Sequence, residues 1–213
     1  MAKCIIILPL YEGEFPELIR REDGDLVLCA DAGFDRAREL GLHDDMVVGD
    51  FDSLGRLPEA DCPVKQLPVH KDDTDTAVCM EEGRKRGYRR FVLAGGIGGR
   101  LDHTLANLHL LADSALRGED AGLTGRDNLV RALASGQHDV KRREGFKLSF
   151  FAYTERVTGL TLSGVAYPLH DAVLTQRIPL GVSNEWTEET ARVSFAEGVL
   201  LVVQSRDAEA ARK

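Results

Sequence analysis

The feature that most constrains the fold is an alternation of short apolar runs with longer helix-like stretches over about the first 115 residues. Four runs are nearly continuous in apolar character, as expected of strands covered on both faces. They lie at Cys4–Leu8, Leu26–Ala30, Met46–Gly49 and Phe91–Ala94. Helices are expected before and after the last run, at about residues 75–86 and 103–116. This order predicts βαβ units around a mostly parallel sheet.

The clearer of the two predicted helices carries one apolar stripe. Its members recur at spacings of four, three and four residues and are Leu101, Leu105, Leu108 and Ala112. That spacing places them on one face of the helix.

The pattern changes after about residue 118. Residues 118–145 are rich in Gly, Asp, Arg and Gln, with one short apolar interlude at Asp127–Leu133. The strands expected beyond this stretch are Lys147–Tyr153, Val157–Leu162, Arg192–Ala196 and Val199–Gln204. Glu197 and Gly198 join the last two in what the spacing predicts to be a tight hairpin.

Two domains follow from this change of pattern. Residues 1–125 are predicted to form a Rossmann-like, mostly parallel α/β/α domain, and residues 126–213 a small all-β sandwich. A chain of 213 residues is long enough for two such domains, each with its own core.

The charge of the chain argues against one class of partner. Lys and Arg number 27 against 35 Asp and Glu, a formal net charge of −8. Because sequence-independent binding of nucleic acid depends on Lys and Arg neutralising phosphates, we expect no nucleic-acid partner. The acidity suits a cationic small molecule, a divalent metal or simply a solvated surface.

The first apolar stretch and the cysteines both indicate where the protein is located. The apolar stretch Cys4–Tyr11 is about half the length of a spanning helix and contains Pro9, so we expect no membrane segment and no signal peptide. The four cysteines, Cys4, Cys29, Cys62 and Cys79, have no close pairing, which favours reduced core thiols over a zinc site or disulfides. The expected location is the cytoplasm.

Four segments with unusual side chains lie directly after a predicted strand or at the start of a predicted helix. They are Asp31–Gly33, Gly49–Ser53, Lys71–Asp75 and Gly95–His103. In an open parallel sheet the ligand crevice lies outside the carboxyl ends of the strands, so these segments are expected to meet at one edge. The alternative is that each Asp caps a turn or helix, as Asp often does.

Two carboxylates two residues apart, Asp50 and Asp52, point the same way if the chain between them is extended, past a Phe51 that points to the core. Two such charges about 4 Å apart repel by roughly 4 kcal/mol at an effective dielectric of 20. A cation among them relieves that repulsion, and Mg²⁺ prefers carboxylate oxygens, waters and phosphates. The expected cofactor is therefore Mg²⁺.

The Gly95–Arg100 segment is a glycine-rich turn between a strand and a helix. Backbone N–H groups, the helix dipole and Arg100 could together face the oxygens of a polyphosphate. The segment lacks the Gly-Lys-Ser/Thr of a P-loop and the third glycine of a dinucleotide fingerprint. At the Lys71–Asp75 segment, Thr74 and Asp75 are explained equally well as a helix cap and a first-turn acid. The residues alone indicate a magnesium-dependent phosphoryl or nucleotidyl transferase.

The four motifs, in this order, closely resemble those of the thiamine pyrophosphokinase family. The motifs that carry the resemblance are Asp-x-Gly, Gly-Asp-Phe-Asp-Ser, Lys-Asp-x-Thr-Asp and Gly-Gly-x-Gly-Gly-Arg-x-Asp-His. The resemblance extends to Lys147–Ser149 and Gly181–Asn184 in the second half of the chain, and so covers essentially the whole chain. The resemblance implies transfer of the pyrophosphoryl group of ATP to the hydroxyl of thiamine, giving thiamine diphosphate and AMP, by a homodimer with thiamine between the subunits.

The resemblance also implies residue roles. The catalytic residues it implies are Asp50, Asp52, Asp72 and Asp102, of which Asp50, Asp52 and Asp72 are also the expected metal ligands. The expected ATP-binding residues are Asp31, Asp72, Thr74, Asp75, Gly98, Gly99 and Arg100. The residues expected near thiamine are Ser183 and Asn184. Either Asp72 or Asp102 would accept the proton of the thiamine hydroxyl.

Two positions stand out against the family pattern. Ala32 replaces a glycine that is common there, and would strain the loop if that position required a positive φ. Trp186 is the single tryptophan and the sole candidate for an aromatic platform, although ordinary burial explains it better. The alternative functions are a pyrophosphokinase for another heterocyclic alcohol such as a pterin, and a Mg-ATP-binding regulator without turnover.

Overall fold

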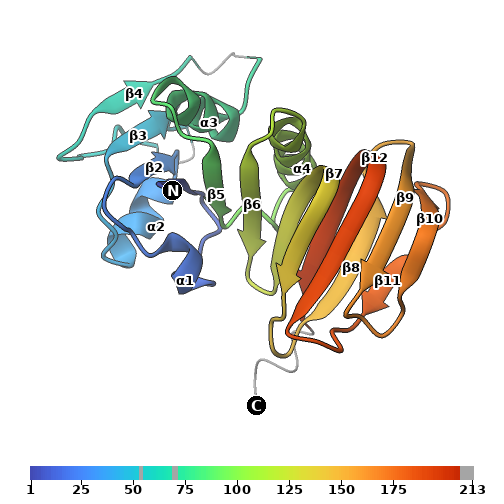
Figure 1. Cartoon of the computed structure of the whole chain (residues 1–213). Helices are drawn as coiled ribbons and strands as arrows, with labels where there is room; N and C mark the ends of the chain where they lie inside the picture. The colour runs from blue at the N-terminus through green and yellow to red at the C-terminus, as the bar shows by residue number, and fades with distance from the viewer. Residues whose placement is uncertain (53–54, 69–71, 207–213) are drawn as a thin grey trace. The chain divides into compact units, whose positions relative to one another are not determined.

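The structure is a computed structural model that describes residues 1–52, 55–68 and 72–206 (Figure 1). Its chain divides into two compact units. The first comprises residues 1–110 and 119–126, and the second residues 111–118 and 127–213. The fold class expected from the sequence, a mixed α/β part with parallel strands followed by a β-rich part, is confirmed.

The first unit is built on a parallel sheet. Its strands are β1 (Cys4–Ile7), β2 (Leu26–Ala30), β3 (Met46–Gly49), β4 (Val64–Gln66), β5 (Arg90–Ala94) and β6 (Asp120–Gly125). They lie in the order β6-β5-β1-β2-β3-β4, and each neighbouring pair is parallel. The four strands expected from apolar runs are confirmed. The apolar runs did not predict β4, which is short and largely exposed, or β6, which is rich in small residues.

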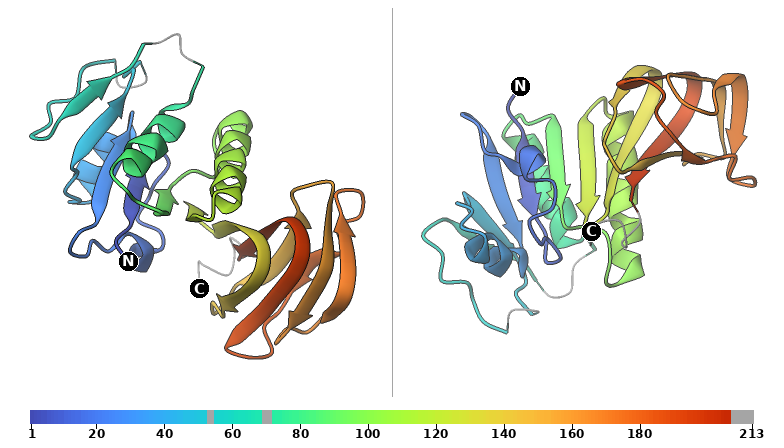
Figure 2. Two further views of the ribbon diagram at one scale, coloured as in Figure 1. Left: turned by 45° about the horizontal axis from the view of Figure 1, so that its top comes forward. Right: turned by 90° about the horizontal axis from the view of Figure 1, so that it is seen from below.

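Helices of the first unit cover both faces of this sheet. They are α1 (Pro16–Ile19), α2 (Gly33–Glu39), α3 (Asp75–Lys85) and α4 (Leu101–Leu116), the last of which continues into the second unit. Phe34 of α2 packs in a core cluster with Ile5 and Ile7, whereas Gly83 of α3 lies against Cys4. Because successive side chains of a strand alternate between faces, α2 and α3 lie on opposite faces (Figure 2).

The apolar stripe expected along α4 is only partly buried. Ala112 is buried, but Leu101 is 69% exposed and Leu105 is 49% exposed. The helical periodicity itself was correct, since the helix runs from Leu101 to Leu116.

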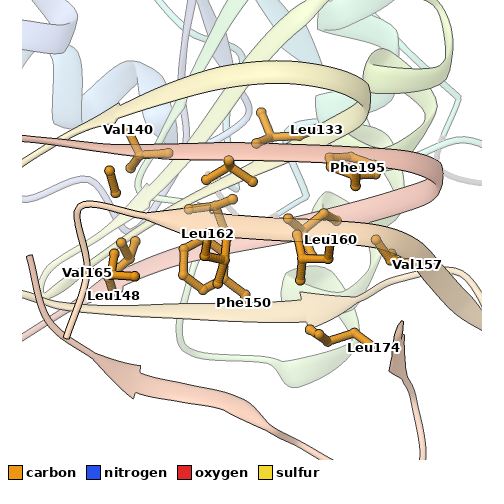
Figure 3. Packing of buried hydrophobic residues seen from close by; sticks show 14 of the residues in the cluster. Leu133, Val140, Leu148, Phe150, Val157, Leu160, Leu162, Val165, Leu174 and Phe195 are labelled. Atoms are coloured by element: carbon orange, nitrogen blue, oxygen red, sulfur yellow. The ribbon is translucent and has the colours of Figure 1, made fainter. Parts of the chain in front are cut away.

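The second unit is antiparallel. Its strands are β7 (Asn128–Lys141), β8 (Lys147–Ala152), β9 (Arg156–Ser163), β10 (Leu169–Thr175), β11 (Gly181–Asn184) and β12 (Thr190–Ser205). β12 pairs with β7 along its length, with β9 over its first part and with β8 over its second part. Figure 3 shows the resulting core, in which side chains such as Phe150, Leu160 and Leu162 lie close together.

Two sequence expectations in this region need correction. The predicted hairpin at Glu197 and Gly198 is a bulge inside the single long strand β12, where the pairing with β7 passes from Phe195–Gly136 to Val199–Ala134. Gly198 has a φ of 99°, so a turn-like residue marks the bulge. The stretch 118–145, expected to be loose, contains the whole of β6 and β7.

No helix within the described residues is long and apolar enough to cross a membrane. All four cysteines are free thiols, and Cys4, Cys29 and Cys79 are buried. Burial raises the pKa of the Cys4 thiol to about 12, so this thiol is unreactive at neutral pH.

Candidate active site

The predicted site residues of the first unit follow the carboxyl ends of its parallel strands. Asp31 comes directly after β2, Asp50 and Asp52 after β3, and Gly95 after β5. Since β2 and β3 are neighbours in the sheet, their following loops start side by side. Ser53 and Lys71, which belong to two of the motifs, lie outside the described residues.

Three carboxylates meet at this edge. One oxygen each of Asp31, Asp50 and Asp52 can be chosen so that all three lie within 4.8 Å of one another. Each such pair of charges repels by about 3 kcal/mol at an effective dielectric of 20. Asp31 is buried, and its Oδ1 has no hydrogen-bond partner among the described residues. A cation at this point would relieve the repulsion and satisfy that oxygen.

The backbone around Phe51 brings Asp50 and Asp52 together. Phe51 is buried and has a φ of 63°, so the chain turns there and is not extended as the sequence argument assumed. The Asp52 N–H donates to Asp50 Oδ1 at 3.3 Å, which holds the turn. The carboxylates of Asp50 and Asp52 therefore converge as predicted, but because the chain turns at Phe51 and not because it is extended. Burial of the Phe51 ring fixes this turn.

Glycines allow the two loops to approach. A Cβ on Gly49 would lie 3.0 Å from the Asp31 Cα, so a side chain there would push β3 away from Asp31. The Asp31 N–H donates to the Val48 carbonyl at 2.8 Å, and this bond fixes the start of the loop. A Cβ on Gly33 would lie 2.1 Å from the Ile7 carbonyl oxygen, so glycine is required there too.

Ala32 does not strain the Asp31 loop. Its φ is −61°, an ordinary right-handed value that any residue adopts. The left-handed conformation belongs to Asp31 itself, with a φ of 47°, and Asp tolerates this region better than most residues. The condition for strain at Ala32, a positive φ, is therefore not met, and the position that excludes a side chain is Gly33.

The segment before α3 contains the remaining predicted acids. Thr74 is the N-cap of α3, and its hydroxyl accepts a hydrogen bond from the Ala77 N–H at 3.2 Å. Asp75 lies in the first turn, where a carboxylate complements the helix dipole. Asp72 is exposed and is not a member of the group of three carboxylates described above.

The glycine-rich turn after β5 is tightly packed at its start and open at its end. A Cβ on Gly95 would lie 2.1 Å from the Tyr11 nitrogen, and one on Gly96 would lie 2.4 Å from Leu123. Gly98 and Gly99 are exposed and both have positive φ, with values of 123° and 57°. The turn thus presents backbone without side chains at the strand ends, as a phosphate-binding turn requires.

Arg100 and Asp102 form an ion pair at the start of α4. Arg100 donates from a terminal guanidinium nitrogen to Asp102 Oδ2 at 2.6 Å, and both side chains are exposed. This hydrogen bond lowers the pKa of the Asp102 carboxyl below its ordinary value. The His103 N–H also donates to Asp102 Oδ1, at 2.9 Å, within the first turn of α4.

One part of this edge was missed from the sequence. The loop after β1 places Leu10 beside Gly98 and Gly99. The hydroxyl of Thr124, near the end of β6, accepts from the Gly95 N–H and donates to Glu14 Oε1. None of these residues stands in a recognisable motif, and only the strand order brings them to the turn.

The candidate thiamine residues of the second unit lie on β11. Asn184 is buried, and its side-chain oxygen accepts from the Tyr167 N–H at 3.0 Å while its amide nitrogen donates to the Tyr167 carbonyl at 2.9 Å. The Tyr167 side chain is 69% exposed. Ser183 has a φ of 59°, and its N–H donates to the Ser149 hydroxyl at 3.0 Å.

Trp186 belongs to the core of the second unit. It is buried in the cluster shown in part in Figure 3, and its indole N–H donates to the Val140 carbonyl at 3.0 Å. Its ring is therefore not available as an exposed platform. Burial in the core, which was also the better explanation from the sequence, explains the position of Trp186.

Two family comparisons match the two parts of the chain separately. Residues 19–120 match "Thiamin pyrophosphokinase, catalytic domain". Residues 137–200 match "Thiamin pyrophosphokinase, vitamin B1 binding domain". The first range contains every acid of the candidate site, and the second contains Ser183 and Asn184.

Solved structures agree over almost the full length. A thiamin pyrophosphokinase family protein from Enterococcus faecalis is 30% identical, with a TM-score of 0.80 over 97% of this chain and 99% of that one. The chain belongs to the thiamin pyrophosphokinase family. A thiamine pyrophosphokinase from Bacillus subtilis is 27% identical over 192 residues, 87% of this chain and 90% of the relative.

The fold of the family is also preserved in detail. A crystal structure of the Bacillus subtilis thiamine pyrophosphokinase superposes with a TM-score of 0.86, at 24% identity, over 97% of this chain and all of that chain. The family catalytic domain therefore corresponds to the parallel α/β part, and the vitamin B1 binding domain to the antiparallel part.

Proposed function

We propose that this protein is a thiamine pyrophosphokinase that transfers the pyrophosphoryl group of ATP to the hydroxyl of thiamine, producing thiamine diphosphate and AMP. The observation that carries the proposal is the convergence of Asp31, Asp50 and Asp52 within 4.8 Å, inside the match to the catalytic domain. We assign nucleotide and metal binding to residues 1–125 and thiamine binding to residues 126–213.

The residues at the first site fit a divalent cation. Three carboxylates supply hard oxygen donors, and the unpartnered, buried Oδ1 of Asp31 is a polar atom that requires a ligand. Asp50 and Asp52 would hold Mg²⁺ together with Asp31, and Asp72 would join them from the segment before α3. A bound Mg²⁺ neutralises charge on the ATP oxygens and aligns the phosphates for in-line transfer.

The other polar groups of the edge bind and orient ATP. Arg100 is exposed, so its guanidinium can exchange the Asp102 carboxylate for phosphate oxygens. Gly98 and Gly99 leave room for a phosphate to approach the backbone. Thr74 and Asp75 fix the start of α3 near this edge.

Two carboxylates are proposed as acceptors of the thiamine hydroxyl proton. Asp72 is exposed, and Asp102 is exposed and paired with Arg100. Because the Arg100 hydrogen bond lowers the pKa of Asp102, transfer of Arg100 to phosphate would make Asp102 the stronger base. Asp102→Asn separates the two assignments, because Asp102 is not proposed to bind metal or ATP: a lower rate of transfer with unchanged ATP binding would identify Asp102 as the acceptor, and an unchanged rate would favour Asp72.

The thiamine-binding assignment rests on the second unit. Asn184 bonds to both backbone groups of Tyr167, so its amide shapes the surface that carries the exposed Tyr167 ring. Ser183, in a left-handed conformation beside it, presents its hydroxyl from the same strand. We propose that this surface binds thiamine, whose thiazolium cation suits an aromatic ring and an acidic protein.

A homodimer is part of the proposal. Exposed apolar side chains occur on β10, on β11 and in the segment between them, namely Val173, Ile178, Leu180 and Val182. A second copy would remove this apolar surface from water. We place the enzyme in the cytoplasm, where ATP is available and thiols such as Cys62 stay reduced.

The test is a product assay. The protein is incubated with ATP, Mg²⁺ and thiamine, and AMP and thiamine diphosphate are quantified against a control without thiamine. Equal, thiamine-dependent amounts of both products support the proposal. AMP without thiamine diphosphate contradicts thiamine as the acceptor and directs a screen of other alcohols such as pterins. ATP binding without either product would identify a regulator.

A further inference from the structure

The order of the strands defines one switch point in the parallel sheet. From β1 the chain moves outward through β2 and β3 to β4, and then returns to place β5 and β6 on the other side of β1. The direction of winding therefore reverses between β1 and β5. In open α/β sheets, ligands bind outside the carboxyl ends of the strands at this reversal.

Two loops flank the switch point. One is the glycine-rich turn after β5, and the other is the loop that follows β1 and contains Leu10. The Leu10 side chain lies over the turn: a Cβ on Gly99 would be 3.2 Å from its Cδ1, and one on Gly98 would be 3.5 Å away. Leu10 is nevertheless 44% exposed, so one side of this apolar group contacts the turn and the other faces solvent.

Leu10 is held in place by its neighbours. The Tyr11 N–H donates to the Leu8 carbonyl at 3.1 Å, and the Tyr11 side chain is buried. Arg36 of α2 donates to the Pro9 carbonyl at 3.2 Å. The backbone of Gly95 packs against Tyr11 so closely that no side chain fits between them. An exposed leucine between two anchored residues is a fixed apolar surface.

We propose that Leu10, beside the glycine-rich turn, forms a shelf for the purine base of ATP; this rests on the proposed function, which makes ATP the donor. A planar base can lie flat on the exposed side of a leucine, and the backbone of Gly98 and Gly99 stays open to the phosphates. The phosphates then extend toward Arg100 and the three carboxylates, the charged part of the same edge. Residue 10 lies before residues 19–120, which match the catalytic domain.

The contribution of the base to binding can be measured separately from that of the phosphates. In calorimetric titrations with Mg²⁺, the wild-type protein should bind ATP more tightly than inorganic tripolyphosphate, which has no base. Leu10→Asn should weaken ATP binding about tenfold, because the apolar contact is lost, and leave tripolyphosphate binding unchanged. Leu10→Met, which preserves the apolar surface, should bind ATP like the wild type.

The matched control is Leu40→Asn. Leu40 is 43% exposed, close to the 44% of Leu10, and it follows α2 in the same unit. It should change the affinity for neither ligand.

Three results would overturn the shelf. They are unchanged ATP affinity in Leu10→Asn, an equal loss for ATP and tripolyphosphate, or a wild-type protein that binds the two equally well. Each can occur while the product assay still yields thiamine diphosphate, so the shelf can fail when the proposed function holds. A wild-type protein that binds neither ligand would contradict both proposals.

Discussion

The two units differ in how they use their polar side chains. At the carboxyl edge of the parallel sheet, three carboxylates converge and the buried Asp31 Oδ1 has no partner among the described residues. In the antiparallel unit, the buried Asn184 amide makes several hydrogen bonds to backbone, and the Trp186 indole bonds to Val140. The first arrangement needs a ligand for its charges, whereas the second already stabilises the fold.

Because of this difference, the motif residues of the two units are expected to have different roles. The carboxylates of Asp31, Asp50 and Asp52 repel one another at short range, so they are candidates for direct contact with metal and ATP. Asn184 acts on its surroundings through Tyr167, so it is a positioning residue for whatever that surface binds. Substitutions in the two units should therefore alter different kinetic parameters.

The largest effect is expected from Asp52→Asn. It removes one charge from the group of three, and kcat should fall by about 10³-fold because stabilisation of the transferring phosphates is lost. Asp52 is exposed, so the melting temperature should change little. Asp61→Asn, at another exposed acid of the same unit, should retain full turnover. Near-normal turnover in Asp52→Asn would remove Asp52 from the site.

Arg100→Ala should have the next largest effect. Loss of the guanidinium should lower kcat/KM for ATP by about 10²-fold, and Arg100→Lys should recover only part of it because an ammonium lacks the planar fork. The thiamine KM should stay the same. Removal of Arg100 also removes the hydrogen bond that lowers the pKa of Asp102, so NMR titration should find that pKa raised. Unchanged steady-state kinetics would count against Arg100 as a phosphate ligand.

Asn184→Ala should give a smaller and different change. The Tyr167 backbone groups lose their partners, which should lower the unfolding free energy by about 2 kcal/mol. Displacement of Tyr167 should raise the thiamine KM by about tenfold and leave the ATP KM unchanged. Tyr167→Ala should raise the thiamine KM without the loss of stability. If only the ATP KM changed, the assignment of this surface to thiamine would fail.

The smallest effect is expected from Ala32→Gly. Because Ala32 has an ordinary right-handed φ, the added backbone freedom should destabilise the protein by less than about 1 kcal/mol and leave the kinetics unchanged. Thermal unfolding and steady-state assays measure both. A marked gain in activity would mean that the loop of Asp31 needs a glycine at this position after all.

The sequence predicted the centre of each sheet better than its edges. Strands such as β2 and β3 are buried on both faces, so their apolar runs were unmistakable. β4, β10 and β11 are short or largely exposed and carry no such signal. Gly198 was mistaken for a hairpin turn because a bulge and a turn both select a glycine with positive φ.

The candidate site was predictable where it depends on strand ends. The convergence of Asp31 with Asp50 and Asp52 follows from the meeting of parallel strand ends at one edge. The turn at Phe51 could not be predicted, because burial of its ring in the folded core sets that conformation. The position of Leu10 depends on the strand order, which no local pattern encodes.

The most direct test of the account is whether the three carboxylates bind a divalent cation. Mn²⁺, which is detectable by electron paramagnetic resonance, would be titrated into the wild-type protein and into Asp31→Asn, with ATP present and absent. The account predicts that Asp31→Asn weakens Mn²⁺ binding by about tenfold or more in both conditions, with the fold intact by circular dichroism. Equal Mn²⁺ affinity in the two proteins would contradict it.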